Sequence, residues 1–192
     1  MNQNFKERLL NRQYQQIPQG VIKRILKEYE KAKNLPRLQY QELTPYFESE
    51  KELFAMCQDF FTYFPFLKEK QEKLKTFEKR TSFIRQQDSS KYRGLTERDL
   101  FGKPYFKLYY NHTLEDLMVL NHEYAHGFYW QNFYTYMEQS FISELEGYFF
   151  EYLTFVFLKE NKILTLNDET KIENNNSWSI KEMFTKFMHG YN

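Results

Sequence analysis

The sequence is poor in cysteine, glycine and proline. The single cysteine, Cys57, excludes an internal disulfide framework and fits a reducing compartment. Only six glycines and five prolines occur among 192 residues, while aromatic residues make up 20% of the chain. Because few turn-forming residues are combined with many large apolar side chains, we expect a mainly helical fold.

Long apolar runs and an excess of one charge are also missing. No stretch approaches the roughly 20 apolar residues that cross a bilayer, and the N-terminal MNQNFKERLLNRQYQQ lacks the apolar region of a secretory signal. The 27 basic side chains nearly balance the 26 acidic ones, so no polybasic surface is expected. We expect a cytoplasmic protein of one domain, residues 1–192, with no nucleic-acid or membrane partner.

Helical periodicity recurs along the chain. The stretch GVIKRILKEYEKAKN (20–34) has one apolar and one charged face. Prolines separate it from helical patterns at about 48–63 and at 66–80. The polar segment 167–178 predicts a loop, and a capping box at 179–182 predicts a short C-terminal helix.

One segment, KPYFKLYY (103–110), predicts a β-strand. It is rich in aromatic residues, it begins near a proline, and Lys107 points to the opposite face from its neighbours. These features favour an edge strand. After a short turn, Thr113 and Asp116 form a T-x-x-D capping box, which predicts a helix that begins at Leu114.

This helix would carry the sequence VLNHEYAHGFYW (119–130), in which His122, Glu123 and His126 form an H-E-x-x-H motif. Residues four apart lie on the same helix face, so both imidazoles can bind one metal ion, and Glu123 stands beside them as a base. Such residues can also be satisfied core or surface groups. Apolar neighbours indicate a buried helix, however, in which polar side chains need partners, and this favours a zinc site.

A catalytic zinc ion needs a third protein ligand. The downstream sequence SFISELEGYFFEYL offers Glu144, Glu146 and Glu151. Glu144 and Glu151 share one helix face, whereas Glu146 points about 200° away from Glu144 and follows Ser143 as a capping-box partner would. We predict that Glu144 is the third ligand, with Glu146 as the alternative, and that Glu151 orients a histidine N–H.

Three segments resemble a known family of enzymes. GKPYFKLYYNHTLEDLMVLNHEYAHGFYW (102–130) resembles the part of oligoendopeptidase F and thimet oligopeptidase relatives in which an edge strand and a T-L-x-D helix start lead into H-E-x-G-H. SELEGYFFE (143–151) is similar to that family's ligand helix, and SSKYRG (89–94) is similar to the segment before its edge strand. The likeness covers about residues 50–160 and is strong from 103 to 153. Ala125 stands where the family has glycine, and the chain is several times shorter than the usual member.

The resemblance implies a mainly α, zincin-like metallopeptidase domain with a short edge strand or hairpin before the H-E-x-x-H helix. It assigns the zinc ligands to His122, His126 and Glu144, and water activation to Glu123. The substrate edge would be formed by Tyr105, Lys107 and Tyr109. The family's carbonyl-binding histidine and tyrosine lie C-terminal to the metal helices, so His189 and Tyr191 are the oxyanion candidates here, with Tyr109 and Tyr110 next.

The sequence therefore predicts a zinc-dependent metalloendopeptidase, an oligopeptidase that cleaves short peptides. The alternative is a catalytically weak remnant that binds zinc or peptide as a structural or regulatory module. The intact H-E-x-x-H favours the enzyme, whereas the missing C-terminal helices favour the remnant. The expected cofactor is Zn²⁺ and the expected partner is a short peptide, and self-association into a homo-oligomer is left open.

Overall fold

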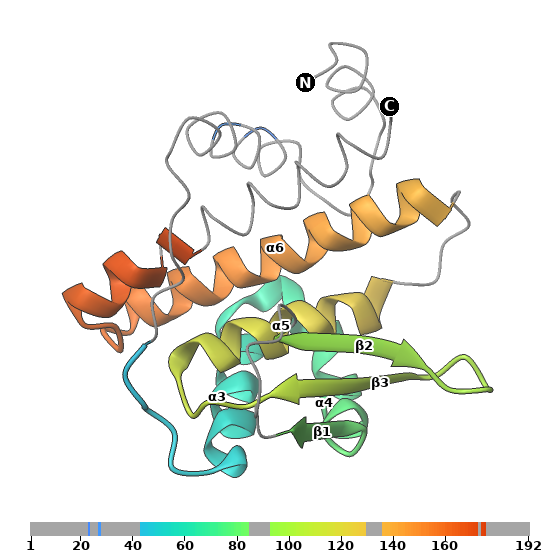
Figure 1. Ribbon diagram of the computed structural model, residues 1–192, viewed down its shortest axis with the longest axis horizontal. Coiled ribbons are helices and arrows are strands. Elements are labelled where there is room, and N and C mark those ends of the chain that lie inside the picture. Colours follow the sequence, from blue (N-terminus) through green and yellow to red (C-terminus); the bar gives the residue numbers. More distant parts are fainter. Residues whose placement is uncertain are drawn as a thin grey trace. The chain divides into compact units, whose positions relative to one another are not determined.

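The fold is mainly helical, as the composition predicts, and it also includes a small sheet (Figure 1). This computed structural model describes residues 23, 27, 43–84, 93–129, 136–172 and 174–175, and it describes only the backbone of residues 129 and 136–142. The chain divides into two compact units, residues 43–168 and residues 1–42 with 169–192. The first unit holds the candidate site and is described below; a single domain spanning 1–192 stays a prediction.

The elements of this unit follow one another with short connections. In chain order they are α3 (Glu50–Tyr63), the 3-10 helix η1 (Pro65–Leu67), α4 (Lys68–Glu78), β1 (Thr81–Ile84), β2 (Gly94–Arg98), β3 (Pro104–Tyr109), α5 (Leu114–Tyr129) and α6 (Tyr136–Glu160). The predicted helices at 48–63 and 66–80 and the helix start at Leu114 are thus confirmed. The predicted helices at 20–34 and after 179 lie outside the described residues, apart from the helical residues 23 and 27.

The prediction of a loop at 167–178 is wrong for the part of this segment that the structure describes. Residues 166–172 and 174–175 are helical. The segment begins with a reciprocal cap, in which the Asp168 N–H donates to Thr165 Oγ1 at 3.1 Å and the Thr165 hydroxyl donates to Asp168 Oδ2 at 2.7 Å. This cap satisfies polar groups of the first turn, so a polar sequence can still begin a helix.

The sheet has the order β1-β3-β2, so the strand predicted at the edge is central. β3 pairs in parallel with β1 and antiparallel with β2. Lys107, whose charge suggested an edge, bonds Glu97 of β2 at 2.7 Å on the outer face of the sheet. On the inner face, Phe106 and Leu108 are fully buried. A charged residue is therefore tolerated on this central strand because its neighbouring strand supplies the partner.

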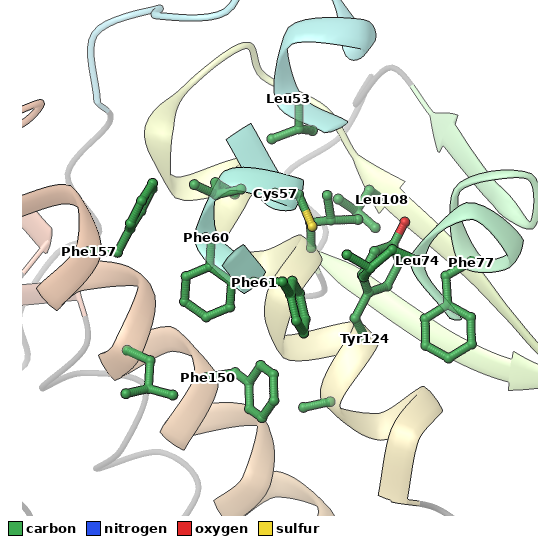
Figure 2. Packing of buried hydrophobic residues seen from close by; sticks show 14 of the residues in the cluster. Leu53, Cys57, Phe60, Phe61, Leu74, Phe77, Leu108, Tyr124, Phe150 and Phe157 are labelled. Carbon is green, nitrogen blue, oxygen red and sulfur yellow. The ribbon is translucent and has the colours of Figure 1, made fainter. Parts of the chain in front are cut away.

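Aromatic side chains from four helices and the sheet form the core (Figure 2). Phe60 and Phe61 of α3 are fully buried, and their rings pack against Phe150 of α6 at centroid distances of 6.2 and 5.9 Å. Burial of each such side chain stabilises the fold by about 1.5–3 kcal/mol. On the sheet side, Phe106 packs against Tyr124 of α5, with ring centroids 4.8 Å apart. The core thus holds α5 between α6 and the sheet.

This arrangement determines what surrounds the motif helix. One side of α5 contacts α6, and another side contacts β2 and β3 (Figure 1). A helix covered on two sides keeps polar side chains away from water, so those side chains need partners from the neighbouring elements. Within the part of the chain that the structure describes, no helix has the length and apolar character required to span a membrane.

Candidate metal centre

The position of the motif helix is set by its first turn. The Asp116 carboxylate accepts the N–H groups of Thr113 at 2.8 Å and of Asn111 at 3.1 Å. This is one half of the predicted capping box. The other half is not formed, because the Asp116 N–H donates to the Thr113 carbonyl at 3.0 Å, and the Thr113 hydroxyl has no hydrogen-bond partner among the described residues.

His122, Glu123 and His126 lie about two turns into α5, and all three are buried. Their potential ligand atoms all lie within 4.8 Å of one another. The two imidazole rings are 4.7 Å apart between centroids and nearly perpendicular, at 83°. Spacing by four residues therefore brings two imidazoles and a carboxylate together in a place from which water is largely excluded.

Glu144 of α6 brings a second carboxylate to the two histidines. Its Oε2 lies 3.5 Å from His122 Nε2, and its Oε1 lies 3.8 Å from His126 Nε2. Ligand atoms bound tetrahedrally to zinc at about 2.0–2.1 Å stand roughly 3.4 Å from one another. Each of the two separations from Glu144 to a histidine is therefore close to the spacing between two ligands of one zinc ion.

The far nitrogen of each imidazole also has a partner on α6. His122 Nδ1 lies 2.6 Å from Glu151 Oε1, and His126 Nδ1 lies 2.6 Å from Ser143 Oγ. When each Nδ1–H donates to these oxygens, both Nε2 atoms keep a lone pair that can bind a cation. One helix thus supplies the motif, and the facing helix supplies a potential ligand and two orienting groups.

The pKa values of the two histidines shift in opposite directions. Burial and the neighbouring His122 lower the pKa of His126 to about 3, so this imidazole is neutral at pH 7. Burial also disfavours a charge on His122, but the carboxylates of Glu151 and Glu144 outweigh it and raise the pKa of His122 well above its ordinary value. The negative field that favours a proton there would equally favour a divalent cation.

Glu123 points toward the sheet and bonds β2. The Thr96 hydroxyl lies 2.5 Å from Glu123 Oε2 and 3.1 Å from the Glu123 carbonyl. Burial raises the pKa of Glu123 to about 7, although His122 and the Thr96 hydroxyl favour the charged form. A carboxylate with a pKa near 7 is well suited to exchange protons at neutral pH.

Two glycines make room for this arrangement. A Cβ atom added at Gly147 would lie 2.5 Å from His122 Nε2, and one added at Gly94 would lie 2.6 Å from Glu123 Oε1. Neither position accommodates a side chain without displacing a residue of the motif. In a helix a glycine costs about 1 kcal/mol relative to alanine, so Gly147 within α6 is a signal that sequence reasoning could have used.

Sequence reasoning also missed the roles of Thr96 and Ser143. The spacing of Ser143 and Glu146 is that of a capping box, but Ser143 lies inside α6 and does not cap a helix there. Glu146 is buried, and burial raises its pKa to about 8 while Lys70 of α4 partly offsets the shift. The charged group near Glu146 is therefore Lys70. Glu144 is the carboxylate that lies within ion-pair distance of both histidines.

The remaining predicted site residues fall elsewhere. Tyr105, Lys107 and Tyr109 lie on the central strand, so a substrate edge at these residues is wrong: both sides of β3 are already paired. Tyr110 packs against Phe83 and His112 rather than at the motif, with ring centroids 5.2 and 4.2 Å away. The oxyanion candidates in the C-terminal segment, residues 189 and 191, lie outside the described residues.

No protein-family model, curated protein or solved structure matches the chain. The resemblance to oligoendopeptidase F and thimet oligopeptidase relatives therefore stays an expectation.

Proposed function

We propose that the chain is a zinc-dependent metallopeptidase that cleaves short peptides. The observation that carries the proposal is the carboxylate of Glu144, whose two oxygens lie 3.5 and 3.8 Å from the Nε2 atoms of His122 and His126. Two imidazoles and one carboxylate are a common ligand set of catalytic zinc, which keeps a fourth position for water or substrate. The partners of each Nδ1 add the orienting contacts that such sites require.

The residues of the site have separate roles in this proposal. Bound zinc would polarise the scissile carbonyl and lower the pKa of water. Glu123 takes a proton from the attacking water and passes it to the leaving amine, for which its pKa of about 7 is suited. Glu151 and Ser143 hold the two imidazoles in the tautomer that presents Nε2.

The substrate would run along β2 rather than along β3. Within the described residues β2 pairs with β3 on one side, and an extended peptide would add to its second edge. Thr96 and Gly94 of β2 contact Glu123, which brings this edge close to the proposed base. Residues 189 and 191 remain candidates for the oxyanion donor, to be tested by deletion of residues 188–192 with zinc content monitored.

A second function has one observation in its favour. The carboxylate of Glu123 also lies within 4.8 Å of the histidine nitrogens, so it could serve as a fourth protein ligand and close the site. A closed site of four protein ligands is typical of structural zinc, as in the zinc-binding remnant considered from the sequence.

Hydrolysis of a mixed peptide library by the wild type and by Glu123→Gln distinguishes the two functions. A peptidase cleaves the library as wild type, and Glu123→Gln retains zinc but loses cleavage, because an amide does not accept the proton. Zinc-loaded wild-type protein that cleaves no peptide would refute the enzyme and favour the structural site.

A further inference from the structure

Glu123 is close enough to the histidines to act either as a base or as a ligand. Its carboxylate lies within 4.8 Å of both imidazoles, a spacing that one metal ion can bridge. A carboxylate that ligates would occupy the position that water needs, whereas one that is held back leaves it open. The function of the site therefore depends on what restrains Glu123.

Thr96 restrains the carboxylate from the side of the sheet. Its buried hydroxyl lies 2.5 Å from Glu123 Oε2, and it is also 3.1 Å from the Glu123 carbonyl. A carboxylate only accepts hydrogen bonds, so the threonine hydroxyl must be the donor. The second distance places the hydroxyl against the backbone of α5 as well. The same Thr96 hydroxyl therefore contacts both the helix backbone and the carboxylate.

Gly94 allows β2 to lie close against the same carboxylate. A Cβ atom at this position would lie 2.6 Å from Glu123 Oε1, 2.7 Å from its Cγ and 2.8 Å from Val119 Cγ1. Gly94 and Thr96 are two residues apart on a strand, and therefore on one face. Both are paired with β3, opposite Leu108 and Phe106 respectively, so the strand that holds the carboxylate is itself held by the sheet.

We propose that Thr96 is a positioning residue that, together with Gly94, keeps Glu123 out of the metal coordination sphere and available as the base. This inference deepens the proposed function and rests on it. Loss of the Thr96 hydroxyl would free the carboxylate to turn toward the histidines and occupy the open position. The site would then bind metal without activating water.

The test compares Thr96→Val with Thr96→Ser, and uses Thr81→Val as the matched control. Thr81 lies on β1 and its hydroxyl bonds Tyr124 at 3.0 Å, so the control removes a hydroxyl from the same sheet at a different place. Zinc content, kcat and KM are measured for each protein. Loss of a contact that orients a residue of the site typically costs about 10–100-fold in activity. We expect a loss of kcat of that order in Thr96→Val, with one zinc per chain and KM within about threefold of the wild-type value.

The cobalt-substituted proteins provide a measurement that does not depend on activity. Visible d–d absorption reports the coordination number and ligands of Co²⁺, because these set the geometry of its ligand field. Thr96→Val should change this spectrum, whereas Thr96→Ser and Thr81→Val should retain the wild-type spectrum. Gly94→Ala approaches the same carboxylate from its other side, so it should change the spectrum too, and it carries the test if Thr96→Val does not fold.

The outcomes separate the inference from the proposed function. Wild-type protein that binds no zinc or cleaves no peptide overturns both. An active wild type together with a folded Thr96→Val that keeps the wild-type kcat and cobalt spectrum overturns the role of Thr96 alone. An equal loss of kcat in Thr96→Val and Thr96→Ser overturns it as well, because the serine hydroxyl would then not restore the contact.

Discussion

Replacement of Gly147 by alanine should damage the metal site while leaving the helix intact. The new Cβ would lie 2.5 Å from His122 Nε2 and from His122 Cε1. An ordinary contact between such atoms is about 3.5 Å or more, so the ring or the helix must move by about 1 Å. The ring does not move freely, because its Nδ1 is bonded to Glu151 at 2.6 Å.

A shift of this size is large for a metal ligand. Zinc ligand distances vary by only about ±0.2 Å, so a movement of about 1 Å should lower zinc affinity by on the order of 100-fold or more. Alanine has the higher helix propensity, by about 1 kcal/mol, which offsets part of the strain. We therefore expect a weak metal site in a protein whose far-UV circular dichroism is unchanged.

Competition with a chromophoric zinc chelator measures the affinity. Gly102→Ala is the control, because Gly102 has a φ of 72° in the β2–β3 turn, away from the motif. Strain at that position should cost about 1–2 kcal/mol of stability and leave zinc affinity unchanged. The reasoning is refuted if Gly147→Ala binds zinc within about threefold of the wild type.

Three further predictions follow from the contacts of the site and of its helix. Glu144→Gln should lower zinc affinity in the chelator assay, whereas Glu146→Gln should leave it nearly intact; the reverse order would show that the wrong face of α6 was chosen. Ser143→Ala should lower zinc affinity by about 10–100-fold, because His126 loses its Nδ1 partner, and unchanged affinity would exclude an orienting role. Burial raises the pKa of Asp116 from 3.8 to about 6, so the folded state holds this proton more tightly than the unfolded chain, and the stability gained from it is lost as the pH rises through that interval. Urea unfolding should therefore show that wild type loses about 2 kcal/mol more than Asp116→Asn between pH 4 and pH 7; equal losses would contradict this.

Local patterns in the sequence predicted the elements that carry the site. The T-x-x-D pattern locates the start of α5 at Leu114, and a spacing of seven residues places Glu144 and Glu151 on one face of α6. Both inferences depend only on helix geometry over a few turns, where periodicity is reliable. The roles of these residues stay predictions, although their positions agree with them.

Long-range pairing could not be predicted in the same way. The position of β3 in the sheet depends on β1 and β2, two strands of only four and five residues, which are too short for their sequence pattern to reveal how they pair. The bond from Thr96 to Glu123 joins residues 27 apart in the sequence and exists only because β2 pairs with β3 over α5. No local pattern encodes such a contact. The strand order and the hydrogen bond from Thr96 to Glu123 could therefore not be predicted from the sequence.

The zinc content of the purified protein tests the central claim most directly. The measurement compares the wild type with His122→Ala and His126→Ala by elemental analysis, and records the melting temperature of each protein with and without added zinc. We predict about one zinc per wild-type chain, loss of the metal in both variants, and a melting temperature that zinc raises only in the wild type. Equal metal content and equal melting temperatures in all three proteins would show that this site does not exist.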